Sequence, residues 1–200
     1  MSELPDDRLR LVDGSPPMTS DALLEKLRRD GFDCPTVEHP PMFTVEDSKS
    51  LRVTPEGQGD IKNLFLRNKK GQMWLVSCHE DRLIDLKRLA AGLGAGRFSF
   101  CSEQRLMHYL GVTPGSVSPL ALINDTSRVV KFFIDRALLE VAEIYLHPLI
   151  NTRTTTIRTA DLLSFAISSG HPPGVLTFLE DRVDCHEPLD RKEPLYDSPL

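Results

Sequence analysis

The sequence lacks the features that mark membrane, secreted and disulfide-stapled proteins. No run approaches the roughly 18 apolar residues needed to cross a bilayer. The first ten residues do not show the basic-then-apolar order of a secretory signal. The four cysteines are scattered, with no short paired spacing. We therefore expect reduced thiols in a cytoplasmic protein that makes no contact with a membrane.

The central part of the chain also lacks a strong excess of charge of either sign. The net charge is −5, but residues 19–177 hold 19 basic against 18 acidic side chains, so the negative charge lies near the two ends. Residues 44–105 hold 11 bases against 8 acids. Dedicated nucleic-acid-binding proteins often have a marked basic excess. These counts permit contact with a few phosphates and argue against sequence-independent duplex binding, and a mixed solvated surface explains them equally well.

Sequence motifs for a cofactor, a metal ion or a serine nucleophile are absent as well. The glycine-rich segment 92–96 follows a predicted helix rather than a strand and has Arg97 in place of a third glycine, so we interpret it as a helix end. The Cys–His pairs at 78–79 and 185–186 are adjacent residues that point to opposite faces of a strand and cannot easily share a zinc ion. Ser116 follows Gly115 but has no glycine two residues after it. We expect no metal and no cofactor.

The 200 residues fit one domain with tails. Folding a chain of this length removes roughly 70% of its surface from water, which is enough for a core without disulfides. We expect a mobile leader at 1–18, a folded domain at 19–177 and an acidic, proline-rich tail at 178–200.

Apolar periodicity and capping residues predict interleaved helices and strands. Helices are expected from Thr19 or Ser20 to Gly31, from Thr44 to about Leu51, after the cap residue Asp85, from Ser102 to Gly111, and from the cap residue Thr159 to Gly170. Strands are expected at Thr36–Glu38, Leu64–Arg67, Met73–Cys78, Phe98–Cys101, Val129–Ile134, Glu143–Leu149 and Thr154–Ile157. Because hairpins join several strands, the pattern favours a mixed sheet in an α+β fold over a doubly wound parallel one.

Three polar segments are candidates for chemistry. The loop from Gly111 to Pro119 holds two glycines and two prolines, which fix its backbone, and its N–H groups could bind an anion or a developing oxyanion. An ordinary rigid turn explains it too. Lys62 precedes a predicted buried strand, where a lysine can hold a phosphate or simply lie in solvent. His147 ends a half-buried strand, as either a structural or a functional histidine.

Together these segments resemble the YbaK/ProX family of free-standing aminoacyl-tRNA deacylases, which is related to the editing insertion of bacterial prolyl-tRNA synthetase. The resemblance covers about residues 19–177. It is closest to the ProX branch, which deacylates Ala-tRNA(Pro). The matching motifs, in chain order, are KNLFL at 62–66, GVTPGSVSP at 111–119, ND at 124–125 and HPLINTRT at 147–154, with HPPMFTVE at 39–46 supporting the ProX branch.

The resemblance implies a mixed, partly closed, β-barrel-like sheet surrounded by helices, and it implies roles for the motif residues. Lys62 would contact the terminal phosphate or ribose of mischarged tRNA(Pro), the backbone at Gly115 and Ser116 would cradle the acyl carbonyl, and His147 would lie against the aminoacyl group. The remaining substrate-binding residues implied are Asn63, Thr44, Val45, Pro114, Asn151 and Thr152. Prolyl-tRNA synthetase is an implied partner.

Two alternatives stay open at this point. The first is a Cys-tRNA(Pro) deacylase of the YbaK branch, whose pocket would take a thiol-sized side chain. The second is a non-catalytic module that binds tRNA or a synthetase and has kept only the fold. A generic small α+β protein is the remaining interpretation.

Overall fold

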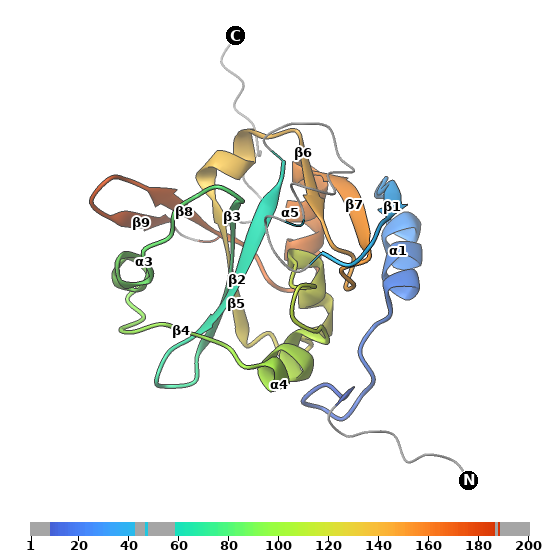
Figure 1. Ribbon diagram of the computed structural model, residues 1–200, viewed down its shortest axis with the longest axis horizontal. Helices are drawn as coiled ribbons and strands as arrows, with labels where there is room; N and C mark the ends of the chain where they lie inside the picture. The colour runs from blue at the N-terminus through green and yellow to red at the C-terminus, as the bar shows by residue number, and fades with distance from the viewer. Residues whose placement is uncertain (1–8, 43–46, 48–58, 187, 189–200) are drawn as a thin grey trace.

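Six strands form the larger sheet, in the order β4-β2-β3-β5-β8-β9 (Figure 1). The computed structural model of the chain describes residues 9–42, 47, 59–186 and 188. Strand β3 runs parallel to β5, and β5 to β8, whereas the other neighbours are antiparallel. The sheet is therefore mixed. Its strands are β2 Ile61–Arg67, β3 Met73–His79, β4 Ser99–Phe100, β5 Val130–Asp135, β8 Gly174–Phe178 and β9 Val183–His186.

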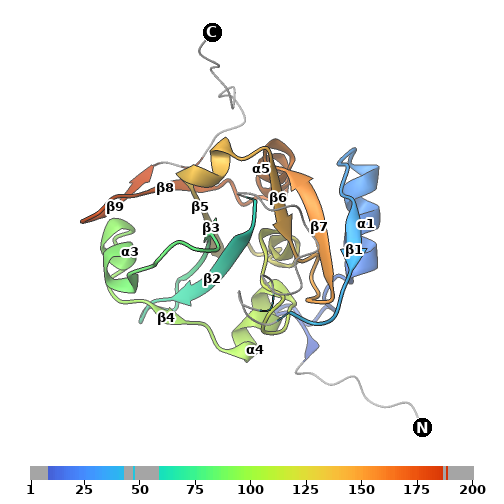
Figure 2. The ribbon, with the colours of Figure 1, turned by 45° about the horizontal axis from the view of Figure 1, so that its top comes forward.

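A second sheet, of order β1-β7-β6, stands against the first (Figure 2). Its strands are β1 Thr36–Glu38, β6 Glu143–Leu146 and β7 Arg153–Arg158. An isolated bridge between Asp60 and Tyr145 links the sheets just before β2 begins. Gly59 makes this close approach possible: a Cβ there would lie 2.3 Å from the Glu143 carbonyl oxygen. The two sheets form the expected mixed α+β, barrel-like arrangement, and the strands among the described residues do not close into a complete barrel.

Helices cover the outside of the two sheets. α1 lies beside β1 and β7 at one end of the molecule, and α3 lies beside β9 at the other, as Figures 1 and 2 both show. α5 packs on β7 and η3. The helices are α1 Ser20–Arg29, α3 Leu86–Gly92, α4 Glu103–Arg105, which continues into the π-helix η2 Leu106–Leu110, the 3₁₀ helices η3 Pro119–Asn124 and η4 Arg136–Glu140, and α5 Thr159–Ser168.

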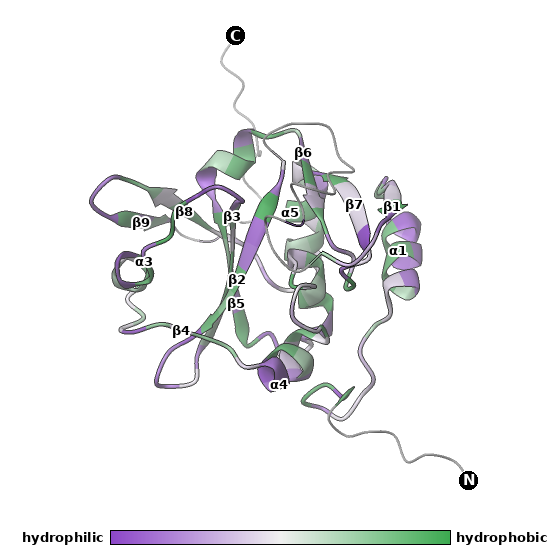
Figure 3. Ribbon diagram, in the orientation of Figure 1, coloured by the Kyte–Doolittle hydropathy of each residue, from purple (hydrophilic) through white to green (hydrophobic). Residues whose placement is uncertain are grey.

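The core has two parts, one on each face of the larger sheet. Met73 and Leu75 of β3 belong to the part shared with α1, η2, η3 and α5. Trp74 and Val76 alternate with them and belong to the part under α3 and β9. The side chains of β3 are buried on both faces apart from half-buried His79 at its end, as the apolar run on both sides of this strand predicted, and Figure 3 shows the hydrophobic colour concentrated on the central strands.

Most expected elements are confirmed within one to three residues. Thr19 caps α1, Asp85 caps α3 and Ser102 caps α4, each accepting bonds from backbone N–H groups. Thr159, in contrast, is the first residue of α5 rather than its cap, because its hydroxyl donates to the Val141 carbonyl instead. The expected helix from Thr44 to Leu51 lies outside the described residues, apart from residue 47, which is helical.

The two ends of the chain contribute more structure than the sequence predicted. Strand β9 lies within the segment expected to be a tail, and it pairs antiparallel with β8 from Val175↔His186 to Phe178↔Val183. Near the other end, Leu11 is buried and the Val12 N–H donates to the His108 carbonyl over 2.8 Å. Both segments are therefore held against the rest of the folded chain by backbone hydrogen bonds.

Candidate functional site

Asn63 connects the β2–β3 hairpin to the loop that precedes η3. Its Oδ1 accepts a 2.6 Å bond from the Ser77 hydroxyl on β3, and its Nδ2 donates a 2.9 Å bond to the Val117 carbonyl. The next residue in the loop, Ser118, is fully buried and donates from Oγ to the His147 carbonyl over 2.7 Å. Three of the four motifs singled out from the sequence thus meet in one chain of hydrogen bonds.

The loop at 111–119 has the fixed geometry that its glycines predict. Gly111 (φ +63°) ends η2 in the left-handed conformation, and a Cβ there would lie 2.6 Å from the Asn124 side chain. Gly115 (φ +86°) also has a conformation that L side chains rarely adopt. The Ser116 N–H donates to the Thr113 carbonyl over 3.1 Å, which closes a turn. This amide is therefore occupied, and the neighbouring amides are the candidate donors to a substrate oxygen; Pro114 is exposed on the outside of the turn.

His147 is half-buried at the end of β6, and one of its ring nitrogens has a fixed partner. Nδ1 lies 2.7 Å from the Arg153 carbonyl oxygen. A carbonyl oxygen can only accept, so Nδ1 carries the proton and Nε2 is left as an acceptor. Burial lowers the pKa of His147 below its usual range, although the bond to the Arg153 carbonyl opposes this and the nearby His39 adds to it. The ring is therefore neutral near pH 7.

Hydrogen bonds of Asn151 and Thr152 join the turn between β6 and β7 to the segment after β1. The Asn151 Nδ2 and carbonyl both bond to the backbone of Met42, at 3.1 and 3.0 Å, and the Thr152 carbonyl accepts from the His39 N–H at 3.0 Å. These contacts place the end of the described segment 9–42 next to His147. Thr44 and Val45 follow directly in the chain, but they lie outside the described residues.

Lys62 lies beside Asn63 on β2, and adjacent residues of a strand point to opposite faces. Its ammonium donates to the carbonyl of Arg82 in the turn between β3 and α3. Arg82 forms an ion pair with buried Asp135 and stacks 4.8 Å from the centre of the Phe178 ring. Lys62 therefore faces a firmly held turn, away from the Asn63 bonds, and its bond to Arg82 uses one of its three N–H donors.

No nucleophilic cysteine or metal cluster accompanies these residues in the described part of the chain. Burial raises the pKa of the Cys78 thiol to about 12 and that of the Cys101 thiol to about 11, so both stay protonated near neutral pH. Within residues 9–42, 47, 59–186 and 188, no three His, Cys, Asp or Glu side chains come together as metal ligands. None of the helices among these residues combines the length and the apolar content of a membrane span.

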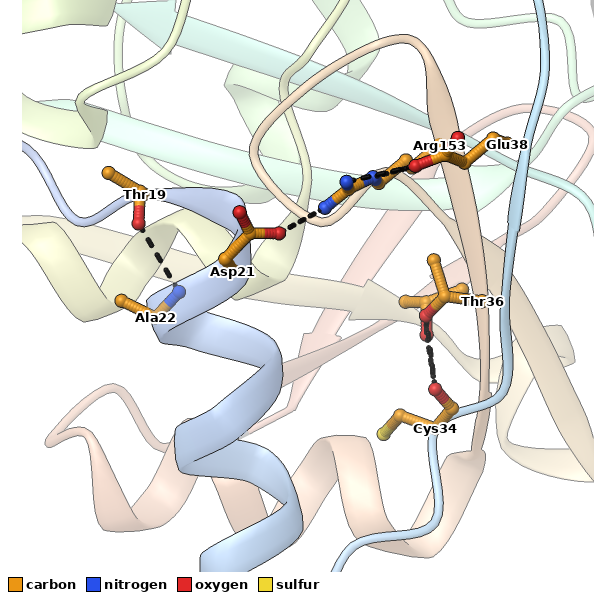
Figure 4. A network of polar contacts seen from close by, with 8 residues as sticks. Thr19, Asp21, Ala22, Cys34, Thr36, Glu38 and Arg153 are labelled. Atoms are coloured by element: carbon orange, nitrogen blue, oxygen red, sulfur yellow. Dashed lines mark hydrogen bonds and ion pairs between the residues drawn. The ribbon is translucent and has the colours of Figure 1, made fainter.

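An open groove of about 340 Å³ lies elsewhere, between α1 and the segment leading to β1. Arg28, Phe32 and Cys34 are among the residues that line it, and none of the site residues predicted from the sequence does. Beside it, Arg153 forms ion pairs with Asp21 of α1 and Glu38 of β1, so α1 is tied to the sheet that carries His147 (Figure 4).

Four residues that contact the predicted site were not singled out individually from the sequence. Ser77 and Ser118 make the bonds described above, and His39 and Thr154 lie next to His147. His39 and Thr154 stand inside the quoted motifs, but the spacing of the residues gives no sign that two segments 115 positions apart bond to each other. Ser77 carries no motif signal at all.

The fold and the site define a class: an α+β protein with a neutral histidine, a rigid glycine-containing loop and a lysine near the start of one strand, where the thiols of Cys78 and Cys101 stay protonated. A family model described as the aminoacyl-tRNA editing domain matches residues 39–165. The chain belongs to this family, as the sequence motifs predicted, and it is a hydrolase of the aminoacyl-tRNA deacylase class.

Several proteins are similar to this chain over most of their length. Prolyl-tRNA synthetase associated domain-containing protein 1 of Danio rerio is 38% identical over 158 residues, which cover 78% of this chain and 85% of that protein. Prolyl-tRNA editing protein ProX of Acetoanaerobium sticklandii is 34% identical over 151 residues, covering 75% and 92%. A crystal structure of a candidate trans-editing enzyme for prolyl tRNA synthetase has the same fold, with a TM-score of 0.60, 18% identity and coverage of 85% and 98%.

Proposed function

We propose that the protein removes alanine from mischarged Ala-tRNA(Pro). The observation that carries this proposal is the hydrogen-bond chain from Ser77 through Asn63 and the loop at 117–118 to His147. It brings together the motifs that are similar to those of the ProX branch, and the similarity to a relative named as a prolyl-tRNA editing protein supports the choice of tRNA(Pro).

In the proposed reaction, water attacks the ester carbonyl directly. The water oxygen bonds to the carbonyl carbon, the bond from that carbon to the ribose oxygen breaks, and the ribose oxygen takes up the proton. Alanine and tRNA(Pro) are released. An aminoacyl ester is already activated, so positioning of water or of the neighbouring ribose hydroxyl, with stabilisation of the oxyanion, suffices. The raised pKa values of Cys78 and Cys101 support a mechanism without a covalent intermediate.

The proposal assigns a role to each of the site residues. Lys62 holds the terminal phosphate or ribose with the donors that Arg82 does not use. Backbone amides next to Ser116 in the Gly115 turn stabilise the acyl oxygen, and Asn63 fixes that turn through Val117. His147 lies against the aminoacyl group. Pro114, Asn151 and Thr152 bind the substrate beside these groups, and the family resemblance adds Thr44 and Val45, which lie outside the described residues. The partner is tRNA(Pro), delivered with or without prolyl-tRNA synthetase in the cytoplasm.

Selection against the correct product is by size. A pocket that takes a methyl side chain excludes the proline ring, which protects Pro-tRNA(Pro). It cannot strongly reject a slightly smaller or larger group, because one such group changes binding by only about 1–3 kcal/mol. We therefore expect some activity on Ser-tRNA as well.

The decisive measurement is kcat/KM on tRNA(Pro) charged in turn with alanine, serine, cysteine and proline. We expect alanine to be hydrolysed fastest and proline to be spared. Faster hydrolysis of the cysteinyl ester would favour the Cys-tRNA(Pro) alternative. Binding of the charged tRNA without hydrolysis would contradict the proposal in favour of a non-catalytic module.

Asn63→Asp tests the hydrogen-bond chain itself. The carboxylate can still accept from Ser77 but can no longer donate to the Val117 carbonyl, so the loop loses its tie to β2. We expect kcat/KM on Ala-tRNA(Pro) to fall about tenfold or more, which corresponds to about 1.4 kcal/mol of transition-state stabilisation. Ser77→Ala removes the other bond of Asn63 and keeps the Asn63–Val117 bond, so we expect it to lower kcat/KM by less than Asn63→Asp does. Equal activity of Asn63→Asp and wild type would remove the loop from the site.

Lys62→Ala tests substrate capture, with Lys70→Ala, an exposed lysine in the β2–β3 turn, as its control. We expect Lys62→Ala to raise KM for the charged tRNA and to weaken the salt dependence of binding, since one phosphate contact is lost. An unchanged kcat/KM would exclude Lys62 from the site.

A further inference from the structure

Asn124, the last residue of η3, joins the elements on the two sides of the loop at 111–119. Its side chain is buried, with 6% of its surface exposed. Its Nδ2 donates a 2.9 Å bond to the carbonyl of Leu110, the residue directly before the loop. Gly111 makes this contact possible, because a Cβ there would lie 2.6 Å from the same Nδ2 atom. The helices before and after the loop are therefore tied together at its base.

The segment that precedes α1 bonds to the same two helices. The Oδ1 of Asn124 accepts a 2.9 Å bond from the Met18 N–H. The Val12 N–H donates to the His108 carbonyl of η2 over 2.8 Å. In Figure 1 this segment runs from the start of α1 toward α4, which continues into η2. A stretch of chain outside residues 39–165, the part that the family model matches, thus holds the elements on both sides of the loop.

The last residues of the loop are held independently of its base. Asn63 on β2 bonds to the Val117 carbonyl, and the carbonyl of His147 accepts from the Ser118 hydroxyl. The turn that the Ser116 N–H closes lies between these bonds and the base at Asn124. A segment held at both ends keeps its amides in place while charge develops on a substrate oxygen, and such preorganised donors are the ones that stabilise an oxyanion.

We infer that Asn124 is a positioning residue for the amides next to Ser116, and that the segment before α1 takes part in this positioning through Met18. The inference rests on the proposed function, in which these amides stabilise the acyl oxygen. The negative charge on that oxygen develops in the transition state, whereas capture of the nucleotide belongs to Lys62 on the other face of β2. Loss of the Asn124 side chain should therefore lower kcat and leave KM nearly unchanged.

Asn124→Ala tests the inference, with Asn68→Ala as its matched control. Asn68 lies in the β2–β3 turn and is equally buried, with 5% of its surface exposed. Its Nδ2 donates to the Ala95 carbonyl and its Oδ1 accepts from the Gln72 N–H. Each variant thus removes a buried side-chain amide that bonds to the backbone in two directions, and both should lose stability.

Only the variant at the base of the loop should lose catalytic power. We expect Asn124→Ala to lower kcat on Ala-tRNA(Pro) about tenfold or more, with KM within about twofold of the wild-type value. We expect Asn68→Ala to keep kcat within about twofold of wild type. Equal kcat values of the two variants would overturn the inference, because the loss would then report stability alone.

Hydrogen exchange of the free protein gives a readout that does not depend on catalysis. The Ser116 N–H should exchange about tenfold faster or more in Asn124→Ala than in Asn68→Ala, since only the first variant releases the base of the loop. In the wild type at low denaturant, the N–H groups of Met18 and Ser116 should open in one step, because both depend on Asn124. This second comparison needs no variant and decides the matter even where Asn124→Ala does not fold.

Three exchange results would contradict the inference. These are separate opening of Met18 and Ser116 in the wild type, equal exchange of the Ser116 N–H in the two variants, and faster exchange in Asn124→Ala with a wild-type kcat. The third result would mean that Asn124 holds the turn without serving the reaction. If the wild type does not hydrolyse Ala-tRNA(Pro), the proposed function fails by itself, and the exchange of the Ser116 N–H still decides whether Asn124 holds the turn.

Discussion

The chemistry available to each cysteine depends on its burial. Cys78 is fully buried on β3, opposite Lys62 in the register of the sheet. The positive charge of Lys62 lowers the pKa of the Cys78 thiol, but the larger effect of burial raises it to about 12. A reactive thiolate needs the opposite balance, with positive charge outweighing desolvation. Cys78 is therefore a core residue that happens to lie near the proposed site.

We expect Cys78→Ala and Cys101→Ala to retain kcat/KM on Ala-tRNA(Pro) within about threefold of wild type. Cys78→Ala should lower the free energy of unfolding by about 1 kcal/mol, since it removes one buried atom from a packed strand. Activity assays with and without a thiol-alkylating reagent check this. A folded Cys78→Ala or Cys101→Ala protein without activity, together with an acyl group trapped on the wild-type thiol, would show that the reaction passes through a thioester, and the direct attack of water would then be wrong.

At the residue scale, Lys62 and Asn63 show that adjacent residues of one strand bond to different parts of the fold. The two residues are neighbours in the sequence, yet Lys62 bonds to the turn before α3 and Asn63 bonds to the loop before η3. Alternation of side chains along β2 makes this separation unavoidable. Under the proposed function, the nucleotide at Lys62 and the acyl group near Asn63 therefore lie on the two sides of the start of this strand.

At the scale of elements, the loop between η2 and η3 depends on backbone geometry. Gly115 has φ +86°, and Gly71, in the β2–β3 turn, has φ +79° with open space around it. An alanine in either place experiences the strain of the left-handed region, which costs about 1–2 kcal/mol. The two glycines can be compared directly, since an alanine at either position experiences the same kind of backbone strain. Gly115 belongs to the proposed site, whereas Gly71 lies in the β2–β3 turn outside it.

We expect Gly115→Ala and Gly71→Ala to lose similar unfolding free energy, about 1–2 kcal/mol each. Only Gly115→Ala should lose activity, by tenfold or more, because its strain distorts the turn that presents the amides next to Ser116. Chemical denaturation and deacylation assays on the two variants check this. Equal activity of the two variants would mean that the turn at Gly115 has no part in catalysis.

At the scale of the whole molecule, strand β9 completes the larger sheet. It pairs with β8 along its length, and buried Val183 joins the core part that holds Trp74 and Leu89. Gly92, at the end of α3, allows this contact: a Cβ there would lie 2.2 Å from the Val183 carbonyl oxygen. The first glycine of the GLGAG segment therefore serves close packing of α3 against β9, in addition to ending the helix.

We expect a chain ending at residue 188 to unfold at a temperature close to that of the full chain, and a chain ending at residue 177 to be less stable by at least about 2–3 kcal/mol. The estimate combines burial of Val183 with the lost hydrogen bonds between β8 and β9. Thermal unfolding followed by circular dichroism compares the two. If both truncated chains melt together, β9 adds nothing to the domain and the boundary predicted at 177 holds.

The sequence predicted those elements that depend on contacts between residues close together in the chain, and it missed those that depend on distant residues. Local signals were sufficient for the caps at Thr19, Asp85 and Ser102 and for the β2–β3 hairpin, because each depends on residues a few positions apart. The edge strand β9 was missed because its four residues, Val183–His186, stand in an acidic context and become a strand only by pairing with β8. Thr159 was mistaken for a cap because its partner, the Val141 carbonyl, lies 18 positions away.

The sequence by itself determined the order of the motifs, the left-handed turns that require glycine, and the family, since these are properties of short segments and their succession. The tertiary structure decided the rest. The side chains of Lys62 and Asn63 point to opposite faces of β2, and the Ser116 N–H donates to the Thr113 carbonyl. The ring centroids of His39 and His147 lie 5.8 Å apart. The physical reason is that sheet pairing joins residues more than a hundred positions apart, as at Val37↔Thr154, and no local pattern records which residues such pairing brings together.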